Sequence, residues 1–160
     1  VFSKELDLPN ISTIMTSTAH GEGWAMYVEL ALYRFAKEQS DNNIFDLVMD
    51  YMYANQLSSH LLETRIDAGI HYEGWTLDRM YNYMSRYYSI TKNDARSIYR
   101  QLVELPGNAM AYNFAYFKIL EMRDYALEHG ASLYDFHKMY LDCGNVPQQF
   151  IENYIHAQYE

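Results

Sequence analysis

A helical hydrophobic period runs through almost the whole chain, and few residues interrupt it. Between residues 44 and 71, side chains suited to burial recur at intervals of three and four, as on one face of an α-helix. The 160 residues include only three prolines and seven glycines, most of them where one helical pattern ends and the next begins. No strand-like alternation bounded by turn residues persists. These features predict an all-α protein.

Capping residues mark the starts of several predicted helices. Asn43, Thr91 and Ser132 are each followed three positions later by an aspartate, and their side-chain oxygens can accept from free backbone N–H groups. Together with the periodicity, these signals predict helices at residues 20–39, 44–71, 76–88, 92–104, 107–129, 132–143 and 147–158.

Short connections organise these helices into one domain that spans residues 1–160. Neighbouring helices joined by short loops pack roughly antiparallel, so we expect a single multi-helix domain of about six to seven helices. Residues 1–18 form an irregular lead-in, with one short turn at 10–16. The chain begins Val-Phe-Ser, without an initiator methionine or a signal peptide. We therefore expect it to be a piece of a longer protein.

Charge and composition exclude several classes of function. The formal net charge is −9 and the twelve Lys and Arg residues are scattered, whereas nucleic-acid binding needs clustered positive charge. No apolar run reaches the roughly 20 residues of a membrane span. One cysteine, Cys143, allows no internal disulfide and leaves the compartment open. We expect no nucleic-acid partner and no membrane span.

The familiar helical metal motifs are absent from the sequence. No histidine is followed by glutamate in an HExxH pattern, and paired Glu-x-x-His helices do not occur. His60 and Glu63 lie three apart but make at most half a site, and a solvated polar face is the favoured interpretation. Cys143 has no local partner that would lower its pKa.

Three segments carry residue types suited to chemistry. Glu22 and Glu29 are seven apart, two turns along one helix face. Asp67 and His71 are four apart, a spacing that lets a carboxylate orient an imidazole. Tyr112 follows a helix break by one turn. Each also has a structural interpretation: a first-turn charge for Glu22, a local pair for Asp67 and His71, and a core residue for Tyr112.

These segments, taken in order, resemble a known family. The run EGWAMYVE, then RIDAGIHYEGWT, LPGNAMAY and FHKMYLDCGNVP, is similar to the carboxy-terminal part of the bacterial domain-of-unknown-function family 885. That family resembles the helical zinc metallopeptidases. The resemblance runs from about residue 18 to the end of the chain.

The resemblance implies a metal-binding role for the first segment. In such peptidases a His-Glu segment supplies two histidine ligands and the general base, and a glutamate on a later helix is the third ligand. That glutamate corresponds to Glu22. Gly23 would then permit close approach of another backbone or of substrate. The Trp24 side chain would line the pocket. Glu29 would orient a ligand histidine from the second coordination sphere.

The same analogy assigns roles to the other segments. His71 and Tyr112 would donate hydrogen bonds to the oxyanion of a tetrahedral intermediate, with Asp67 holding His71. Trp75 would line the substrate cleft with Trp24. Many family members carry Arg-Tyr shortly before the Pro-Gly, where this chain has Gln101 and Leu102, so the role of Arg100 in substrate recognition is open.

We therefore expect the chain to carry only part of the function of a longer protein. We expect the carboxy-terminal fragment of a zinc-dependent peptidase or amide hydrolase, whose partners are the rest of the parent chain and a peptide-like substrate. Because the His-Glu segment is missing, the chain alone should bind no zinc and be inactive. A non-catalytic module that binds a peptide or saccharide in an aromatic cleft is the alternative, and a plain scaffold domain is a third possibility. An uncovered cleft face would favour a homodimer.

Overall fold

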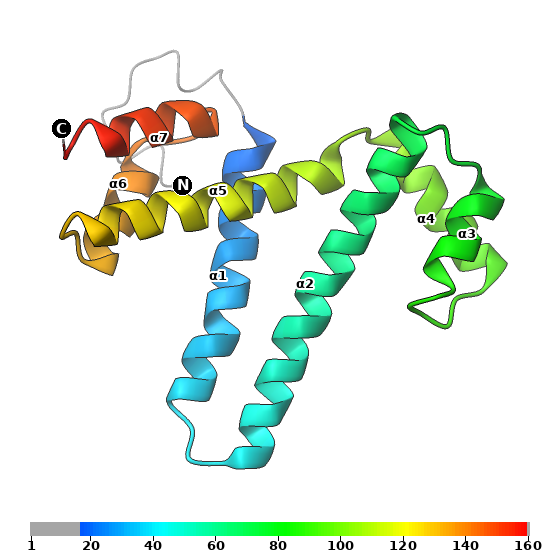
Figure 1. Ribbon diagram of the computed structural model, residues 1–160, viewed down its shortest axis with the longest axis horizontal. Coiled ribbons are helices and arrows are strands. Elements are labelled where there is room, and N and C mark those ends of the chain that lie inside the picture. Colours follow the sequence, from blue (N-terminus) through cyan, green and yellow to red (C-terminus); the bar gives the residue numbers. More distant parts are fainter. Residues whose placement is uncertain (1–16, 160) are drawn as a thin grey trace. The chain divides into compact units, whose positions relative to one another are not determined.

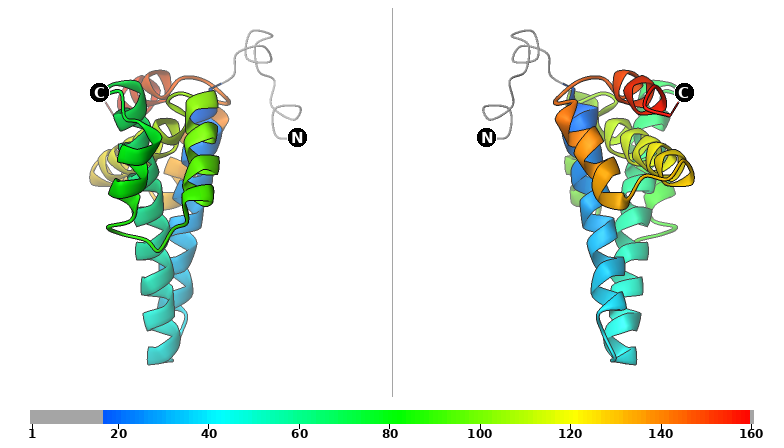
Figure 2. Two further views of the ribbon diagram at one scale, coloured as in Figure 1. Left: turned by 90° about the vertical axis from the view of Figure 1, so that its right-hand side faces the viewer. Right: turned by 90° about the vertical axis from the view of Figure 1, so that its left-hand side faces the viewer.

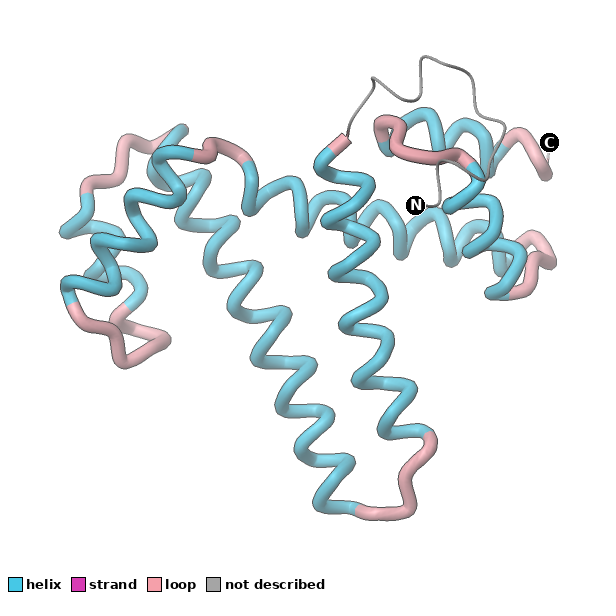
Figure 3. The backbone as a smooth tube through the Cα atoms, turned by 180° about the vertical axis from the view of Figure 1, so that it is seen from behind, coloured by secondary structure: helices cyan, strands magenta, loops and turns pink. Residues whose placement is uncertain are grey.

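The computed structural model describes residues 17–159, and this part of the chain is helical (Figure 1). Its seven helices are α1 (Thr18–Glu38), α2 (Asn43–His71), α3 (Leu77–Met84), α4 (Lys92–Glu104), α5 (Asn108–Glu128), α6 (Leu133–Asp142) and α7 (Gln148–His156). Figure 3 shows only helices and short loops within these residues. The prediction of an all-α fold with six to seven helices is confirmed. The predicted turn at 10–16 lies outside the described residues, and Thr18 of the predicted lead-in already belongs to α1.

Helix capping explains where several of these helices begin. The Thr91 hydroxyl accepts from the Asp94 N–H at 3.2 Å, and Ser132 forms a reciprocal capping box with Asp135, both as predicted. At α2 the predicted cap is one residue late. The Asn42 side chain, not that of Asn43, accepts from the backbone N–H groups of residues 44 and 45. Two consecutive asparagines have equal capping ability, so the sequence pattern does not separate them.

The helical domain comprises two compact units, which are described one at a time. The terminal unit contains residues 1–27 and 114–160, and the central unit contains residues 28–113. The boundary between them falls inside α1 and inside α5.

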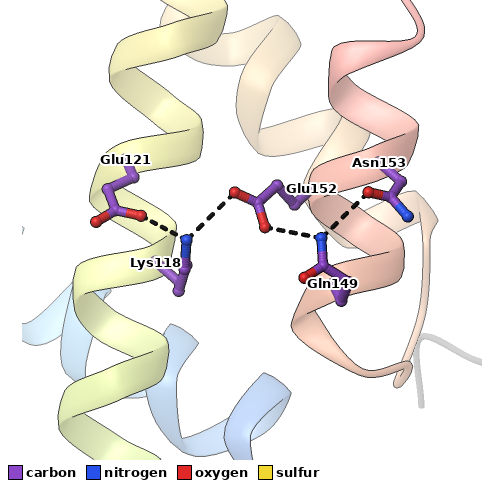
Figure 4. Close-up of polar contacts among 5 residues, drawn as sticks. All are labelled: Lys118, Glu121, Gln149, Glu152 and Asn153. Carbon is purple, nitrogen blue, oxygen red and sulfur yellow. Dashed lines mark hydrogen bonds and ion pairs between the residues drawn. The ribbon is translucent and has the colours of Figure 1, made fainter.

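The terminal unit has an aromatic and aliphatic core. Its fully buried side chains include Met26, Ile119, Phe136, Tyr140 and Ile151. A polar link on the surface also joins α5 to α7 (Figure 4). There the Lys118 ammonium lies 2.7 Å from a Glu121 carboxylate oxygen and 3.3 Å from one of Glu152. Both carboxylates raise the pKa of Lys118 through hydrogen bonds, that of Glu121 foremost.

The central unit consists of a long helical hairpin and two shorter helices. Residues 28–38 of α1 and the first half of α2 form the hairpin, which an ion pair between Lys37 and Asp50 links at 2.7 Å. Farther along, α3 and α4 pack beside the last turns of α2 (Figures 1 and 2). Ile66, Met80 and Ala95 are completely buried there, so the core of the central unit gathers at this end of α2.

Candidate functional site

Glu22 lies in the second turn of α1, in the terminal unit. Its side chain is half-buried. Within residues 17–159 its carboxylate makes no hydrogen bond or ion pair with another residue. A half-buried carboxylate without a partner loses hydration and regains little from the protein.

Gly23 lets α1 approach α5 within the terminal unit. A Cβ atom added at Gly23 would lie 2.2 Å from the Cβ of Ala115 and 3.1 Å from its backbone carbon. No side chain fits at that distance. The expected close approach of another backbone is therefore confirmed, and the backbone is that of α5.

Trp24 belongs to a packed group of aromatic rings. Its ring stacks on Tyr140 with centroids 5.1 Å apart and meets the edge of His137 at 5.3 Å. The Tyr27 hydroxyl and His137 Nε2 are 2.9 Å apart. Burial raises the pKa of Tyr27 and lowers the pKa of His137, so a protonated hydroxyl donates to a neutral imidazole. We call these residues, with His20 and Phe136, the Trp24 cluster.

In the central unit, Asp67 and His71 hold the connection between α4 and α5. Asp67 is 1% exposed, and its Oδ1 accepts from the Gly107 N–H at 3.1 Å. The same oxygen lies 3.5 Å from His71 Nε2. That nitrogen lies 2.9 Å from the Leu102 carbonyl, which can only accept, so Nε2 donates to Leu102. The Nδ1 atom of His71 is then the ring nitrogen left to meet a ligand.

Tyr112 lines a cavity of about 370 Å³ within the central unit. The ring of Tyr112 stacks on His60 with centroids 5.7 Å apart. Glu63, Gln101 and Asn108 add polar groups to the wall. We call this space the His60 cavity.

Glu29 reaches the same cavity through a chain of hydrogen bonds. The Gln56 amide nitrogen lies 3.2 Å from Glu29 Oε2 and 3.2 Å from His60 Nε2. Because an amide nitrogen only donates, His60 Nε2 accepts and the ring carries its proton on Nδ1. Glu29 and Tyr112 are thus brought together through Gln56 and His60. Sequence reasoning placed His60 on a solvated face and did not single out Gln56, because no local pattern relates residues 27 positions apart.

Trp75 does not face a cleft, contrary to expectation. It is 3% exposed, in the core of the central unit. Its indole N–H donates to Glu73 at 2.9 Å, and the guanidinium groups of Arg65 and Arg79 lie over its ring at 4.5 and 4.8 Å. The sequence pattern places a tryptophan after a helix but does not reveal what packs around it. The burial indicates a core residue.

The predicted site residues fall into both units. Glu22 and Trp24 belong to the terminal unit, whereas Glu29, Asp67, His71, Trp75 and Tyr112 belong to the central unit. Within the central unit, the carbonyl of Leu102 accepts from His71 and its side chain lines the His60 cavity with Tyr112. A common site that also includes Glu22 stays a prediction.

Arg100 is not part of the His60 cavity wall. Its side chain is 74% exposed and lies 3.8 Å from Glu104 on the same helix. The neighbouring Gln101 lines the cavity in its place.

The described residues do not form a complete metal site by themselves. Within residues 17–159, no three His, Cys, Asp or Glu side chains are grouped so that they could hold a metal ion. Zinc in proteins needs three or four protein ligands, and Glu22 has one carboxylate. In the same part of the chain, no helix is both long and apolar enough to cross a membrane.

Comparison with known proteins found a matching family and a similar solved structure. The sequence model of a family described as "Bacterial protein of unknown function (DUF885)" matches residues 1–155. A search of curated proteins gave no match. The crystal structure of a protein described as a "putative lipoprotein" from Colwellia psychrerythraea is similar, with a TM-score of 0.78 and 26% sequence identity. The similarity covers 96% of this chain and 26% of that one, so this chain spans about a quarter of that protein's length.

Proposed function

Since the chain belongs to the DUF885 family of bacterial proteins, we propose that it is the carboxy-terminal part of a zinc-dependent hydrolase of peptides or related amides. It would supply the third zinc ligand and residues of the substrate cleft. The rest of the parent chain would supply the His-Glu segment, with two ligands and the general base. The length of the Colwellia psychrerythraea protein, of which this chain spans 26%, supports a larger parent.

The unpartnered carboxylate of Glu22 carries this proposal. It is half-buried and makes no hydrogen bond or ion pair within the described residues. Carboxylate oxygen is a normal zinc ligand, and the positive charge would compensate the lost hydration of Glu22. Bound zinc polarises a scissile carbonyl and lowers the pKa of its water.

The other candidate residues would position the substrate. In its doubly protonated form, His71 would donate from Nδ1–H to the developing oxyanion together with the Tyr112 hydroxyl, while Asp67 holds the ring in place. The contact of His71 Nε2 with the Leu102 carbonyl supports this role, because it orients the ring and leaves Nδ1 available. Glu29 would act indirectly, by fixing the tautomer of His60 through Gln56.

Zinc content tests the role of Glu22. In a parent protein that contains the His-Glu segment, we expect about one zinc per chain, lost in Glu22→Gln and retained in the matched variant Glu73→Gln. The 160-residue chain alone should bind no stoichiometric zinc. Elemental analysis after purification without added metal measures the zinc content of the parent protein and of the 160-residue chain. One zinc per 160-residue chain that disappears in Glu22→Ala would contradict a site divided between two parts of the parent.

A binding module without chemistry is the second candidate. The His60 cavity favours it, since a volume of about 370 Å³ with a tyrosine ring, a carboxylate and amides suits a saccharide or peptide side chain. An intact His-Glu segment ending in Pro-Gly-His in the parent would favour the hydrolase, and its loss would favour the binder.

We also propose that the isolated chain self-associates through the face that carries Glu22 and Trp24, or that its lead-in segment folds back across this face. In the parent, this face would be covered by the helix that bears the His-Glu segment. An uncovered apolar face tends to pair with a copy of itself. Light scattering at several concentrations tests self-association, and a strictly monomeric chain with Trp24 fully exposed would contradict both alternatives.

A further inference from the structure

A second cavity in the central unit lies outside the predicted site. Its volume is about 300 Å³ and its wall is formed by α2 and by the end of α3 with the turn after it. We call it the Tyr83 cavity; it is lined by Ser58, Leu61, Leu62, Arg65, Tyr83, Tyr87 and Tyr88. No residue of the proposed zinc site or of the His60 cavity lines it.

One helical stripe of α2 forms the first wall. Ser58, Leu61, Leu62 and Arg65 have the spacing of residues on one helix face. At 1.5 Å per residue, Ser58 and Arg65 are about 10 Å apart along the helix axis. The stripe is apolar in the middle and ends at a guanidinium group.

Tyrosine rings form the opposite wall. The rings of Tyr83 and Tyr87 have centroids 5.5 Å apart, and the Tyr88 hydroxyl is tied to Ser59 Oγ on α2 at 3.0 Å. A hydrogen bond with Tyr87 raises the pKa of Tyr83, so its hydroxyl stays protonated at neutral pH. These rings give an apolar surface edged with hydroxyl donors.

Arg65 is held in place at its end of the cavity. Its guanidinium lies 4.5 Å from the centroid of a Trp75 ring and 5.9 Å from that of Tyr83. Its Nη2 is 2.8 Å from a carboxylate oxygen of Glu73. A guanidinium fixed in this way loses little side-chain entropy when it binds a further ligand.

Positive charge exceeds negative charge beside the cavity. Glu73 is shared between Arg65 and Arg79, whose Nη2 lies 3.3 Å from it. Arg86 adds a third guanidinium, 5.8 Å from the Tyr83 ring centroid. Three guanidinium groups and one carboxylate are thus placed around the tyrosine and tryptophan rings, in a chain whose net charge is −9. The charge at this cavity favours an anion.

We propose that the Tyr83 cavity binds a small apolar carboxylate. The hydrocarbon or aryl body lies between the leucines of α2 and the tyrosine rings, and the carboxylate meets Arg65. The volume is at the lower end for ligand sites, which suits a single side chain or a short hydrocarbon chain. This proposal does not depend on zinc or on hydrolysis.

Paired acids and amides test the charge recognition. N-acetylphenylalanine and octanoate represent a peptide carboxy-terminal residue and a short fatty acid, and their amides are the uncharged controls. In NMR titrations of the isotope-labelled full chain, each acid should bind about tenfold more tightly than its amide, because hydrogen bonds to charged groups are the stronger ones. Tighter binding of N-acetylphenylalanine would identify a peptide carboxy-terminus as the ligand, and tighter binding of octanoate would identify a fatty acid. Equal binding of acids and amides, or binding of neither acid, would overturn the proposal.

Two charge variants on the same helix locate the site. Leu61→Glu places a negative charge in the cavity, whereas the matched variant Leu47→Glu places it at a position that is 69% exposed and outside the cavity. We expect acid binding to fall at least tenfold in Leu61→Glu and to be unchanged in Leu47→Glu. In Arg65→Met, which retains an apolar side chain, the preference for acid over amide should disappear. Circular dichroism confirms that each variant is folded, and unchanged acid binding in folded Leu61→Glu would overturn the assignment.

Discussion

The tripeptide Glu-Gly-Trp occurs twice in this chain, and its two copies have different environments. At residues 22–24 it lies inside α1, and at residues 73–75 it forms the turn after α2. Gly23 is helical and pressed against Ala115, whereas a Cβ atom at Gly74 would meet nothing within 4 Å. Gly74 instead has a φ of 67°, which strains any residue with a side chain. One glycine is required for space and the other for backbone conformation.

The glutamates of the two copies differ in their polar contacts, and the tryptophans differ in their burial. Glu73 accepts a hydrogen bond from the Trp75 indole and forms ion pairs with two arginines, so its negative charge is compensated within the fold. Glu22 has no such partner among the described residues. Trp75 is buried, and Trp24 is half-buried at the edge of an aromatic cluster. The second copy is therefore built into the core of its unit, whereas the first has a half-buried carboxylate without a partner among the described residues.

Removing each tryptophan should give the largest difference between the copies. Trp75→Ala should lower the free energy of unfolding by about 3 to 5 kcal/mol, because it leaves a cavity and removes the surface on which two guanidiniums stack. Trp24→Ala should cost roughly 2 kcal/mol, since less of that ring is buried. Urea denaturation followed by circular dichroism measures both. A larger loss for Trp24→Ala would reverse the comparison.

The two glycines should respond to different substitutions. Gly23→Ala should cost about 1 to 3 kcal/mol through overpacking against Ala115, although alanine favours a helix by about 1 kcal/mol. Gly74→Ala should cost about 1 to 2 kcal/mol through backbone strain, and Gly74→Asn less, because asparagine tolerates positive φ. Gly21→Ala in the same helix as Gly23 is the control, since its added Cβ meets nothing within 4 Å and should stabilise. Thermal unfolding measures the stability of these glycine variants. A Gly23→Ala variant more stable than the original chain would refute the close approach of Gly23 to Ala115.

Acid should destabilise the surroundings of Trp24 more than those of Trp75. Burial lowers the pKa of His20 and of His137 from 6.5, and Arg123 lowers that of His137 further. The unfolded chain then binds more protons than the folded one, so stability is complete above about pH 6.5 and falls as the pH drops toward 5.

Single-tryptophan variants separate the two environments. Trp75→Phe leaves the fluorescence of Trp24 as a reporter, and Trp24→Phe leaves that of Trp75. Between pH 7 and 5 the unfolding midpoint reported by Trp24 should fall more than that reported by Trp75. Replacing both His20 and His137 with asparagine should flatten the Trp24 profile, and an unchanged slope in that variant would exclude these histidines as the cause.

Neutralising each glutamate should give the smallest effect. Glu73→Gln should destabilise the chain, because its hydrogen bond to Trp75 and the charges of Arg65 and Arg79 hold the pKa of Glu73 below its usual value. Glu22→Gln should leave stability unchanged or slightly raise it in this chain. Urea denaturation at low salt compares the two, because urea is uncharged and does not screen the ion pairs. A clear loss of stability in Glu22→Gln would reveal a structural role for that carboxylate.

Local signals in the sequence were sufficient to predict the helices and one contact of the candidate site. The predicted range 92–104 matches α4 at both ends, because Thr91 caps it and Leu105-Pro-Gly ends it. The i, i+4 spacing of Asp67 and His71 correctly placed their side chains near each other, at 3.5 Å. The helix predicted over 76–88 ends early at Met84, where the backbone carbonyl of residue 84 accepts from Tyr87 and Tyr88 in a turn. Helix starts and neighbours one turn apart depend on nearby residues, so they can be read locally.

What the sequence alone determined is the all-α class, the order of the helices, most of their caps and membership in the family. Tertiary structure decided what each functional residue contacts. It directed His71 Nε2 to the Leu102 carbonyl, connected Glu29 to His60 through Gln56, and buried Trp75 beneath two arginines. It also gave the two Glu-Gly-Trp copies different environments. The physical reason is that capping and periodicity act within one or two helical turns, whereas burial and ligand geometry depend on residues brought together from distant parts of the chain.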